Sequence, residues 1–161
     1  MKKIDYPFIP EGREIFYVGE DNEFMRAAKE ECLSHSTDMN QPTGSVAVLN
    51  GKIIGKASNQ ARIKHKKFAE LHKRMLCVRK LLKVKTGTKY WLCPGCAKFS
   101  DHSEARAVKD AKRNGYTTAG ADLYLYGHWW CCEPCWNAMI EGGIKNVYLL
   151  EGSEELFVRK K

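Results

Sequence analysis

The chain has 161 residues, of which 43% are hydrophobic and 29% are charged, with a formal net charge of +8. This length fits a single domain spanning residues 1–161 with a core of its own. No apolar run reaches the roughly 18 residues that a membrane helix needs. No apolar segment follows the N-terminal lysines either, so we expect neither a membrane span nor a secretory signal.

Cysteine usage indicates metal binding rather than a disulfide framework. The seven cysteines are an odd number, and four of them form two CxxC pairs, Cys93–Cys96 and Cys132–Cys135. Such pairs in a chain without an export signal are typical of metal sites in a reducing compartment. We therefore expect a cytoplasmic protein.

The positive charge is concentrated in one segment. Residues 61–90 contain eleven Lys or Arg and a single acid, Glu70, a local balance of +10. Such a segment should meet an anion, either a nucleotide phosphate or a nucleic acid. A basic face that is merely solvated is the alternative.

The first half of the chain predicts a helix and a hairpin. Residues 1–19 are expected to form an irregular lead-in, and apolar residues at helical spacing predict a helix over 21–34. Two β-rich runs, 45–49 and 52–57, are joined by Asn50-Gly51, a strong hairpin signal.

The second half begins with a basic insertion over 61–98, in which residues 68–82 predict one amphipathic helix. Its apolar face would contain Phe68, Leu71, Met75, Val78 and Leu82.

Helices at 102–114 and 132–141 then alternate with strands at 122–126 and 145–150. Alternation of this kind implies parallel strands covered by helices. The chain is therefore expected to be an α/β protein, whose mixed sheet has an antiparallel N-terminal hairpin and parallel C-terminal strands.

Four residues at two predicted helix starts could form a metal centre. His102 and Glu104 begin one helix, and Cys132 and Cys135 begin another. Two cysteines three apart share one helix face, and the positive potential of a helix N-terminus favours thiolates. Three protein ligands would leave the fourth zinc position open for water, which is typical of a catalytic site. Zinc lowers the pKa of such a water from ~16 to roughly 7, and Glu104 could move its protons.

Each half of this pattern also has a simpler interpretation. Asp101 and Glu104 fit a helix capping box, and a lone CxxC is more often a structural zinc site or a redox pair. The two halves together, both at helix starts, favour the catalytic interpretation.

The pattern resembles the cytidine and deoxycytidylate deaminase family, whose signature is H-x-E followed by P-C-x-x-C. The resemblance runs from about Thr43 to Leu150 and is closest to the deoxycytidylate branch. It is carried by these segments: 43–48, 54–59, His102-Ser103-Glu104, Cys132-Glu133-Pro134-Cys135 and 143–148. It implies a three-layer α/β/α fold in which His102, Cys132 and Cys135 bind catalytic zinc.

The same resemblance implies the reaction. Zinc hydroxide would attack C4 of cytosine while Glu104 shuttles protons, most simply converting dCMP to dUMP and ammonia. Asn59 would contact the substrate sugar, and the backbone at Ser103 would face the cytosine carbonyl. The small-molecule partner would be a cytosine nucleotide, and the chain would form a homo-oligomer.

The chain departs from the family pattern next to the metal ligands. Cys131 replaces the proline before the first cysteine, which leaves a spare thiol beside the site. His128 replaces a threonine or similar residue, and Trp129 and Trp130 follow it. The tryptophans could form a wall of the base pocket or simply be buried aromatics.

A second metal site is the hypothesis for the remaining CxxC pair. Cys93 and Cys96 with Cys77 and His72 would give a closed Cys3His structural zinc site. The competing fourth ligands are Cys32, His35 and His65. The alternative is a pair of ordinary thiols in a tight turn.

Two other functions are compatible with the sequence. The basic segment 61–90 and the paired tryptophans could serve a deaminase acting on single-stranded nucleic acid or tRNA. A non-catalytic zinc-containing nucleic-acid-binding module is the third hypothesis.

Overall fold

The computed structural model describes residues 7–74, 77–84 and 88–158. Its centre is a five-stranded sheet in the order β1-β5-β4-β2-β3. The strands are β1 Ile15–Val18, β2 Gly44–Leu49, β3 Lys52–Ser58, β4 Asp122–Tyr126 and β5 Asn146–Leu150. The hairpin β2–β3 is antiparallel and β4–β5 is parallel, which confirms the predicted mixed sheet.

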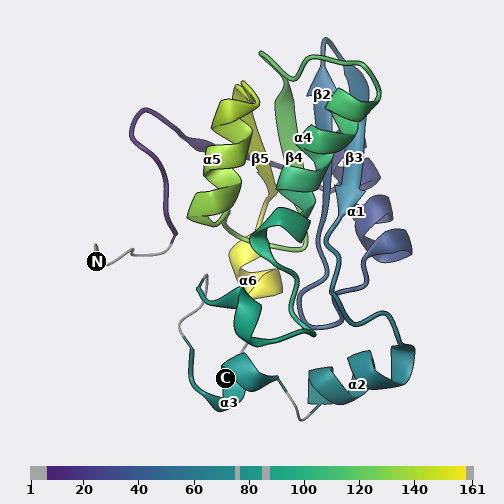
Figure 1. Ribbon diagram of the computed structural model, residues 1–161. Coiled ribbons are helices and arrows are strands. Elements are labelled where there is room, and N and C mark those ends of the chain that lie inside the picture. Colours follow the sequence, from purple (N-terminus) through teal and green to yellow (C-terminus); the bar gives the residue numbers. More distant parts are fainter. Residues whose placement is uncertain (1–6, 75–76, 85–87, 159–161) are drawn as a thin grey trace.

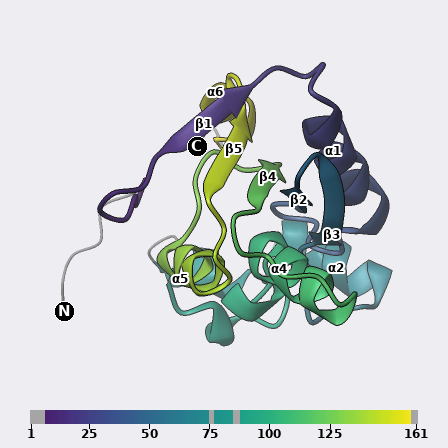
Figure 2. The ribbon, with the colours of Figure 1, turned by 90° about the horizontal axis from the view of Figure 1, so that it is seen from above.

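Helices cover both faces of this sheet (Figures 1 and 2). They are α1 Glu23–His35, α2 Lys66–Arg74, α3 Val78–Leu81, α4 Ser103–Arg113, α5 Glu133–Glu141 and α6 Ser153–Phe157. Figure 2 shows α1 on one side of the strands and α4 and α5 on the other. The three-layer α/β/α prediction is confirmed.

The strand pleat divides the core between the two faces. Successive residues of a strand point to opposite sides, so Val46 and Val48 pack with Met25 of α1. Ala47 between them packs with Ala107 of α4. Two apolar cores therefore fix the helices on either side of β2.

Two glycines set how closely the helices approach. A Cβ on Gly44 would lie 2.3 Å from the carbonyl oxygen of Ala28 in α1. A Cβ on Gly55 would lie 2.5 Å from the carbonyl oxygen of Ala107 in α4. The hairpin is consequently in direct backbone contact with a helix on each face.

The expectation of an irregular lead-in over 1–19 is wrong for Ile15–Val18. These residues form β1, which pairs in parallel with β5 and places Ile15 opposite Val147. A four-residue edge strand has little pattern of its own, and its partner lies more than a hundred residues away in sequence. Residues 1–6 of the expected lead-in lie outside the described residues.

The single helix predicted over 68–82 is also wrong. The segment forms two short helices, α2 and α3, and Met75 lies outside the described residues. Phe68 is 61% exposed and Leu82 is 59% exposed, so the predicted apolar face does not join the core. The two helices instead turn His72 and Cys77 inward toward the second CxxC pair.

This insertion lies beyond one end of the sheet (Figure 1). Gly44 at the start of β2 pairs with Ser58 at the end of β3 and with Tyr126 at the end of β4. The segments that follow β3 and β4 therefore leave the sheet at the same end, and the insertion begins there after β3. Among the described helices, none is long and apolar enough to cross a bilayer.

Candidate active site

The three predicted metal ligands meet at the starts of two adjacent helices. His102 is the N-cap residue of α4, and Cys132 is the N-cap residue of α5. The Nδ1 atom of His102 lies 3.5 Å from Sγ of Cys132 and 3.4 Å from Sγ of Cys135. With Zn–S near 2.3 Å and Zn–N near 2.05 Å, the edge of a zinc tetrahedron is about 3.5 Å. The donor atoms are thus already at zinc spacing.

The electrostatics of Cys132 suit a metal cation, whereas the hydrogen bond with Cys132 raises the pKa of the Cys135 thiol well above its ordinary value. A hydrogen bond from Cys135 lowers the pKa of the Cys132 thiol to about 5, so the thiolate is favoured at neutral pH. A Cys2His donor set fits zinc and leaves one tetrahedral position for water. The bound ion would supply a water whose pKa falls to roughly 7.

Glu104 lies in the first turn of α4 and is almost completely buried. Its Oε2 is 3.2 Å from the Ser103 hydroxyl, which is also 2.8 Å from the Ser45 hydroxyl. Burial raises the pKa of the Glu104 carboxyl, which suits a group that both takes and releases a proton. The capping-box interpretation is not supported, because His102 rather than Asp101 is the N-cap residue.

A cavity of about 780 Å³ opens onto these groups. Its walls include His102, Glu104 and Cys132. The rest of the wall comes from the 38–43 loop, Asn59, the insertion, the 128–130 segment and the C-terminal helix. The cavity is large enough to hold a small molecule against the metal ligands.

Asn59 lines this cavity, and its side chain is held by hydrogen bonds. Its Oδ1 accepts hydrogen bonds from the Thr43 backbone N–H at 2.9 Å and from the Ser36 hydroxyl at 2.6 Å. Its Nδ2 donates to the carbonyl of Gln41 at 2.7 Å. Asn59 therefore shapes the loop that borders the cavity, and its contact with a sugar remains a prediction.

Ser103 is completely buried next to Glu104, the predicted proton shuttle. Its hydroxyl lies 3.0 Å from the Thr43 hydroxyl, within the same chain of hydroxyls that reaches Glu104. The side chain thus links the start of β2 to the first turn of α4. The predicted contact of its backbone with a carbonyl of the base stays a prediction.

The residues that depart from the family pattern divide between the core and the cavity. Cys131 is buried in the core on the α5 side, where burial raises its pKa well above the ordinary value, so the thiol stays neutral. His128, Trp129 and Trp130 all line the cavity. The structure therefore supports the pocket-wall interpretation of the tryptophans, although Trp130 is also buried.

Sequence reasoning missed the residues that give the cavity its charge. Among the described residues, its cations are Arg79, Lys80 and Lys83, which follow Cys77 in the insertion. Tyr90 adds an aromatic ring to the same wall. The charge excess of 61–90 located the segment, but only the placement of α3 and the residues after it shows which cations line the cavity.

The family comparison agrees with this geometry. The model of the cytidine and deoxycytidylate deaminase zinc-binding region matches residues 18–151, and the chain belongs to this family. It is accordingly a zinc-dependent hydrolytic deaminase. His102, Cys132 and Cys135 form a group that could hold the metal. Membership of this family favours an enzyme over the non-catalytic zinc-containing module.

Several solved structures are similar to the chain at low identity. A dCMP deaminase of the cyanophage S-TIM5, in complex with dCMP and dUMP, is 16% identical, with a TM-score of 0.48 over 83% of this chain and 84% of that one. A tRNA:A34 deaminase is 21% identical, with a TM-score of 0.45 over 79% and 75%.

A third similar structure is a much longer protein from Thermotoga maritima. It is a diaminohydroxyphosphoribosylaminopyrimidine deaminase/5-amino-6-(5-phosphoribosylamino)uracil reductase that is 23% identical, with a TM-score of 0.45. The match covers 78% of this chain but only 28% of that protein. A search of curated proteins gave no match.

Proposed function

We propose that the protein hydrolyses the 4-amino group of a cytosine nucleotide, converting dCMP and water to dUMP and ammonia. One observation carries the proposal: a single cavity contains the catalytic group His102, Glu104 and Cys132 and also the cations of the insertion. The family to which the chain belongs includes deoxycytidylate deaminases. A nucleotide offers its base to the catalytic group and its phosphate to the cations of the insertion.

In this reaction the chain's own residues position the base and move protons. Glu104 takes a proton from the attacking water and delivers protons to ring nitrogen N3 and to the departing amine. The Ser103 hydroxyl, 3.2 Å from Oε2 of Glu104, fixes the orientation of that carboxyl. Trp129 borders the same cavity and offers an aromatic face against which a base can stack.

The insertion provides the charge that a nucleotide requires. Lys80 and Lys83 are exposed, and both line the cavity. Lysine ammonium groups donate charge-assisted hydrogen bonds to phosphate. Glu104 and Asp38 are the only acids among the cavity-lining residues of the described chain. The wall therefore favours an anionic substrate over the uncharged nucleoside.

The deciding experiment is ammonia release from cytidine, deoxycytidine, CMP, dCMP, dCTP and a cytosine-containing single strand, with zinc content measured on the same sample. The proposal predicts the highest kcat/KM for dCMP and a much lower value for deoxycytidine. Equal rates for nucleoside and nucleotide would show that the cations do not bind phosphate. Turnover of the single strand alone would reject the proposal.

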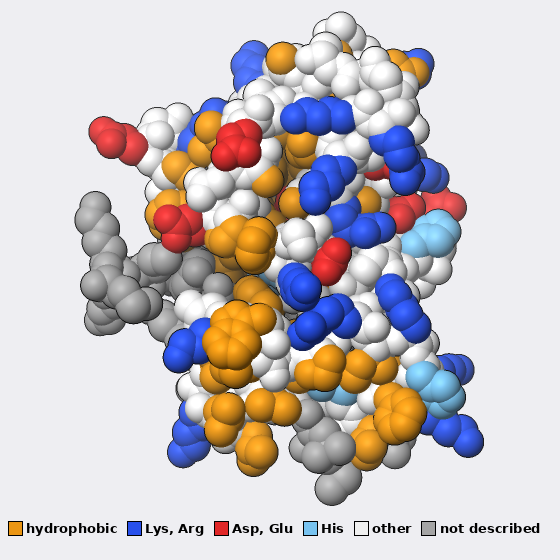
Figure 3. Space-filling view, in the orientation of Figure 1, with side chains coloured by type: hydrophobic (Ala, Val, Ile, Leu, Met, Phe, Trp, Pro, Cys, Tyr) orange, Lys and Arg blue, Asp and Glu red, His pale blue; other side chains and the backbone are white. Residues whose placement is uncertain are grey.

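A polymer substrate is the second candidate, and the surface of the insertion favours it. Trp91 is 69% exposed and Phe68 is 61% exposed, and both lie in or beside the basic segment 61–90. Figure 3 shows apolar side chains gathered where Figure 1 places α2 and α3, with Lys and Arg side chains around them. Such a surface is compatible with stacked bases and a phosphate backbone. Salt-sensitive binding of single strands would support this candidate.

A further inference from the structure

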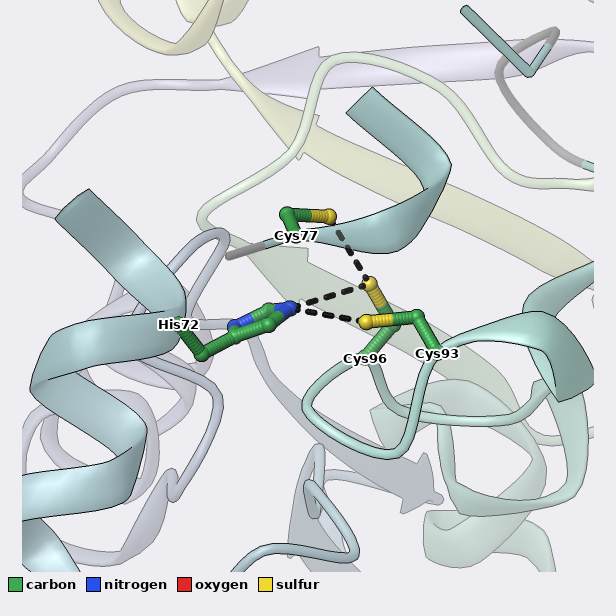
Figure 4. A group of neighbouring side chains, drawn as sticks. All are labelled: His72, Cys77, Cys93 and Cys96. Atoms are coloured by element: carbon green, nitrogen blue, oxygen red, sulfur yellow. Dashed lines mark hydrogen bonds between the residues drawn. The ribbon is translucent and has the colours of Figure 1, made fainter. Parts of the chain in front are cut away.

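Four side chains of the insertion, none of them a predicted active-site ligand, converge on one point (Figure 4). His72 comes from α2, Cys77 precedes α3, and Cys93 and Cys96 flank a tight turn. Their donor atoms all lie within 4.8 Å of one another. All four residues are buried, with exposed fractions of 7% or less.

The distances lie around the edge lengths of a metal tetrahedron. Sγ of Cys77 and Sγ of Cys96 are 3.8 Å apart, and two sulfurs on a zinc ion at ~2.3 Å are separated by about 3.8 Å. The Nε2 atom of His72 lies 3.0 Å from Sγ of Cys93 and 3.8 Å from Sγ of Cys96. A disulfide is excluded for Cys77 and Cys96, because it would need a sulfur separation of about 2.05 Å.

Groups around the cluster prepare it for a cation bound by thiolates. The side-chain amide of Asn40 contacts Nδ1 of His72 at 2.7 Å. The contact is made by the amide nitrogen Nδ2, and it holds the imidazole ring with Nε2 facing the sulfurs. The Arg79 guanidinium lies 3.8 Å from Sγ of Cys96, a position that favours the charged thiolate.

The turn between the two cysteines has the shape that this arrangement requires. The N–H of Cys96 donates to the carbonyl of Cys93 at 3.2 Å, which closes the turn around Pro94 and Gly95. A Cβ on Gly95 would lie 2.3 Å from the ring of His72. Only glycine therefore lets the imidazole reach the two sulfurs.

We propose that His72, Cys77, Cys93 and Cys96 bind a second zinc ion in a closed Cys3His site. Four protein ligands leave no coordination position for water, so the ion is structural rather than catalytic. A ligand group of three thiolates and one imidazole selects zinc over the hard cations magnesium and calcium.

This zinc site would fix the wall of the catalytic cavity. It joins α2, α3 and the 93–96 turn, and Cys77 and Cys96 themselves line the cavity. Arg79, Lys80 and Lys83 follow Cys77 directly, so their position depends on the position of that ligand. The N–H of Ala97, next to Cys96, also donates to Asp38, another residue of the cavity wall, at 3.3 Å.

The test counts zinc ions per chain and needs no turnover, so its outcome is separate from that of the proposed reaction. Purified wild-type protein should contain about two zinc ions, and Cys132→Ser, which removes a catalytic ligand, should keep about one. Cobalt loaded into Cys132→Ser should give the intense thiolate-to-metal absorption of a tetrahedral site with three sulfur ligands. Cys32→Ala, which removes a buried thiol outside both groups, is the control and should keep both ions.

One zinc in the wild type and none in Cys132→Ser would overturn the proposal. Retention of two ions by a folded Cys93→Ser variant would overturn it as well. If Cys93→Ser does not fold, the comparison of wild type with Cys132→Ser still decides the question.

Discussion

The ring of Tyr90 meets the ring of His102 edge-on, with 5.0 Å between the ring centroids. The guanidinium of Arg79 lies 4.1 Å from the centroid of the same Tyr90 ring. One aromatic side chain of the insertion therefore joins a predicted ligand of the catalytic metal to a cation of the cavity wall.

Loss of the Tyr90 ring should weaken catalysis without removing the catalytic metal. An edge-to-face aromatic pair contributes about 0.5–1.5 kcal/mol, so Tyr90→Ala should lower kcat/KM for dCMP about 2- to 10-fold. Tyr90→Phe keeps the ring and should behave like the wild type. Steady-state kinetics with zinc analysis checks this, and equal losses in both variants would show that the hydroxyl matters instead.

Removal of a cavity cation should weaken binding of the nucleotide through its phosphate and leave binding of the nucleoside unchanged. A hydrogen bond to a charged group contributes about 1.5–3 kcal/mol, so Lys80→Ala and Lys83→Ala should each raise KM for dCMP about 10-fold or more. KM for deoxycytidine should not change. Lys67→Ala, which removes an exposed lysine of α2, is the matched control. An equal rise of KM for nucleoside and nucleotide would contradict the role in phosphate binding.

Replacement of Glu104 by its isosteric amide should remove the proton carrier and preserve the zinc site. General acid–base catalysis contributes typically 10²–10⁴-fold, so kcat of Glu104→Gln should fall by about that factor. Zinc content should stay at the wild-type level because Glu104 is not a ligand. Glu141→Gln changes an exposed carboxyl at the end of α5 and should keep full activity. A wild-type kcat in Glu104→Gln would refute the assignment of Glu104 as the proton shuttle.

The contact between β2 and α1 should make Gly44 intolerant of any side chain. A Cβ there would lie 2.5 Å from the backbone nitrogen of Cys32 as well as 2.3 Å from the Ala28 carbonyl oxygen. Overpacking typically costs about 1–3 kcal/mol, and Gly44→Ala should lower the free energy of unfolding by at least that amount. Ser34→Ala, at an exposed position of α1, should leave it within about 0.5 kcal/mol. Urea unfolding measures both variants.

Cys32 should make stability depend on alkaline pH. Burial raises the pKa of its thiol from 9.0 to about 11, so the folded state holds the proton more tightly than the unfolded state. The resulting stabilisation is fully present below pH 9 and is lost as the pH rises through about 11. The difference in unfolding free energy between wild type and Cys32→Ala should shrink across this window. A constant difference would contradict the shifted pKa.

The frame of the enzyme was predictable because its signals are local. Asn50-Gly51 marks the hairpin, and His102 and Cys132 lie at helix starts. The spacing of Cys132 and Cys135 places both sulfurs on one face of α5. Metal binding by the second CxxC pair, Cys93 and Cys96, was also predicted from local spacing. His72 and Cys77 join it, whereas His35 pairs with Glu31 at 3.0 Å.

The cavity wall and the edge strand were less predictable because both depend on distant contacts. Residues 68–82 show an apolar period, yet Leu82 is exposed, because α2 and α3 are separate helices placed so that His72 and Cys77 meet the second CxxC pair. Strand β1 has only four residues and exists through its pairing with β5.

The insertion leaves and rejoins the rest of the molecule at a single point. The N–H of Gln60, directly after Asn59, donates to the carbonyl of Asp101, directly before His102, at 2.9 Å. This backbone hydrogen bond joins the two ends of the insertion, and the contacts of His72 with Asn40 and of Tyr90 with His102 hold its middle against the rest of the molecule. Since the entropy of closing a loop grows only slowly with its length, segments of other lengths could be exchanged here at little entropic cost. The cavity wall can therefore be rebuilt while the ends of the insertion stay in place.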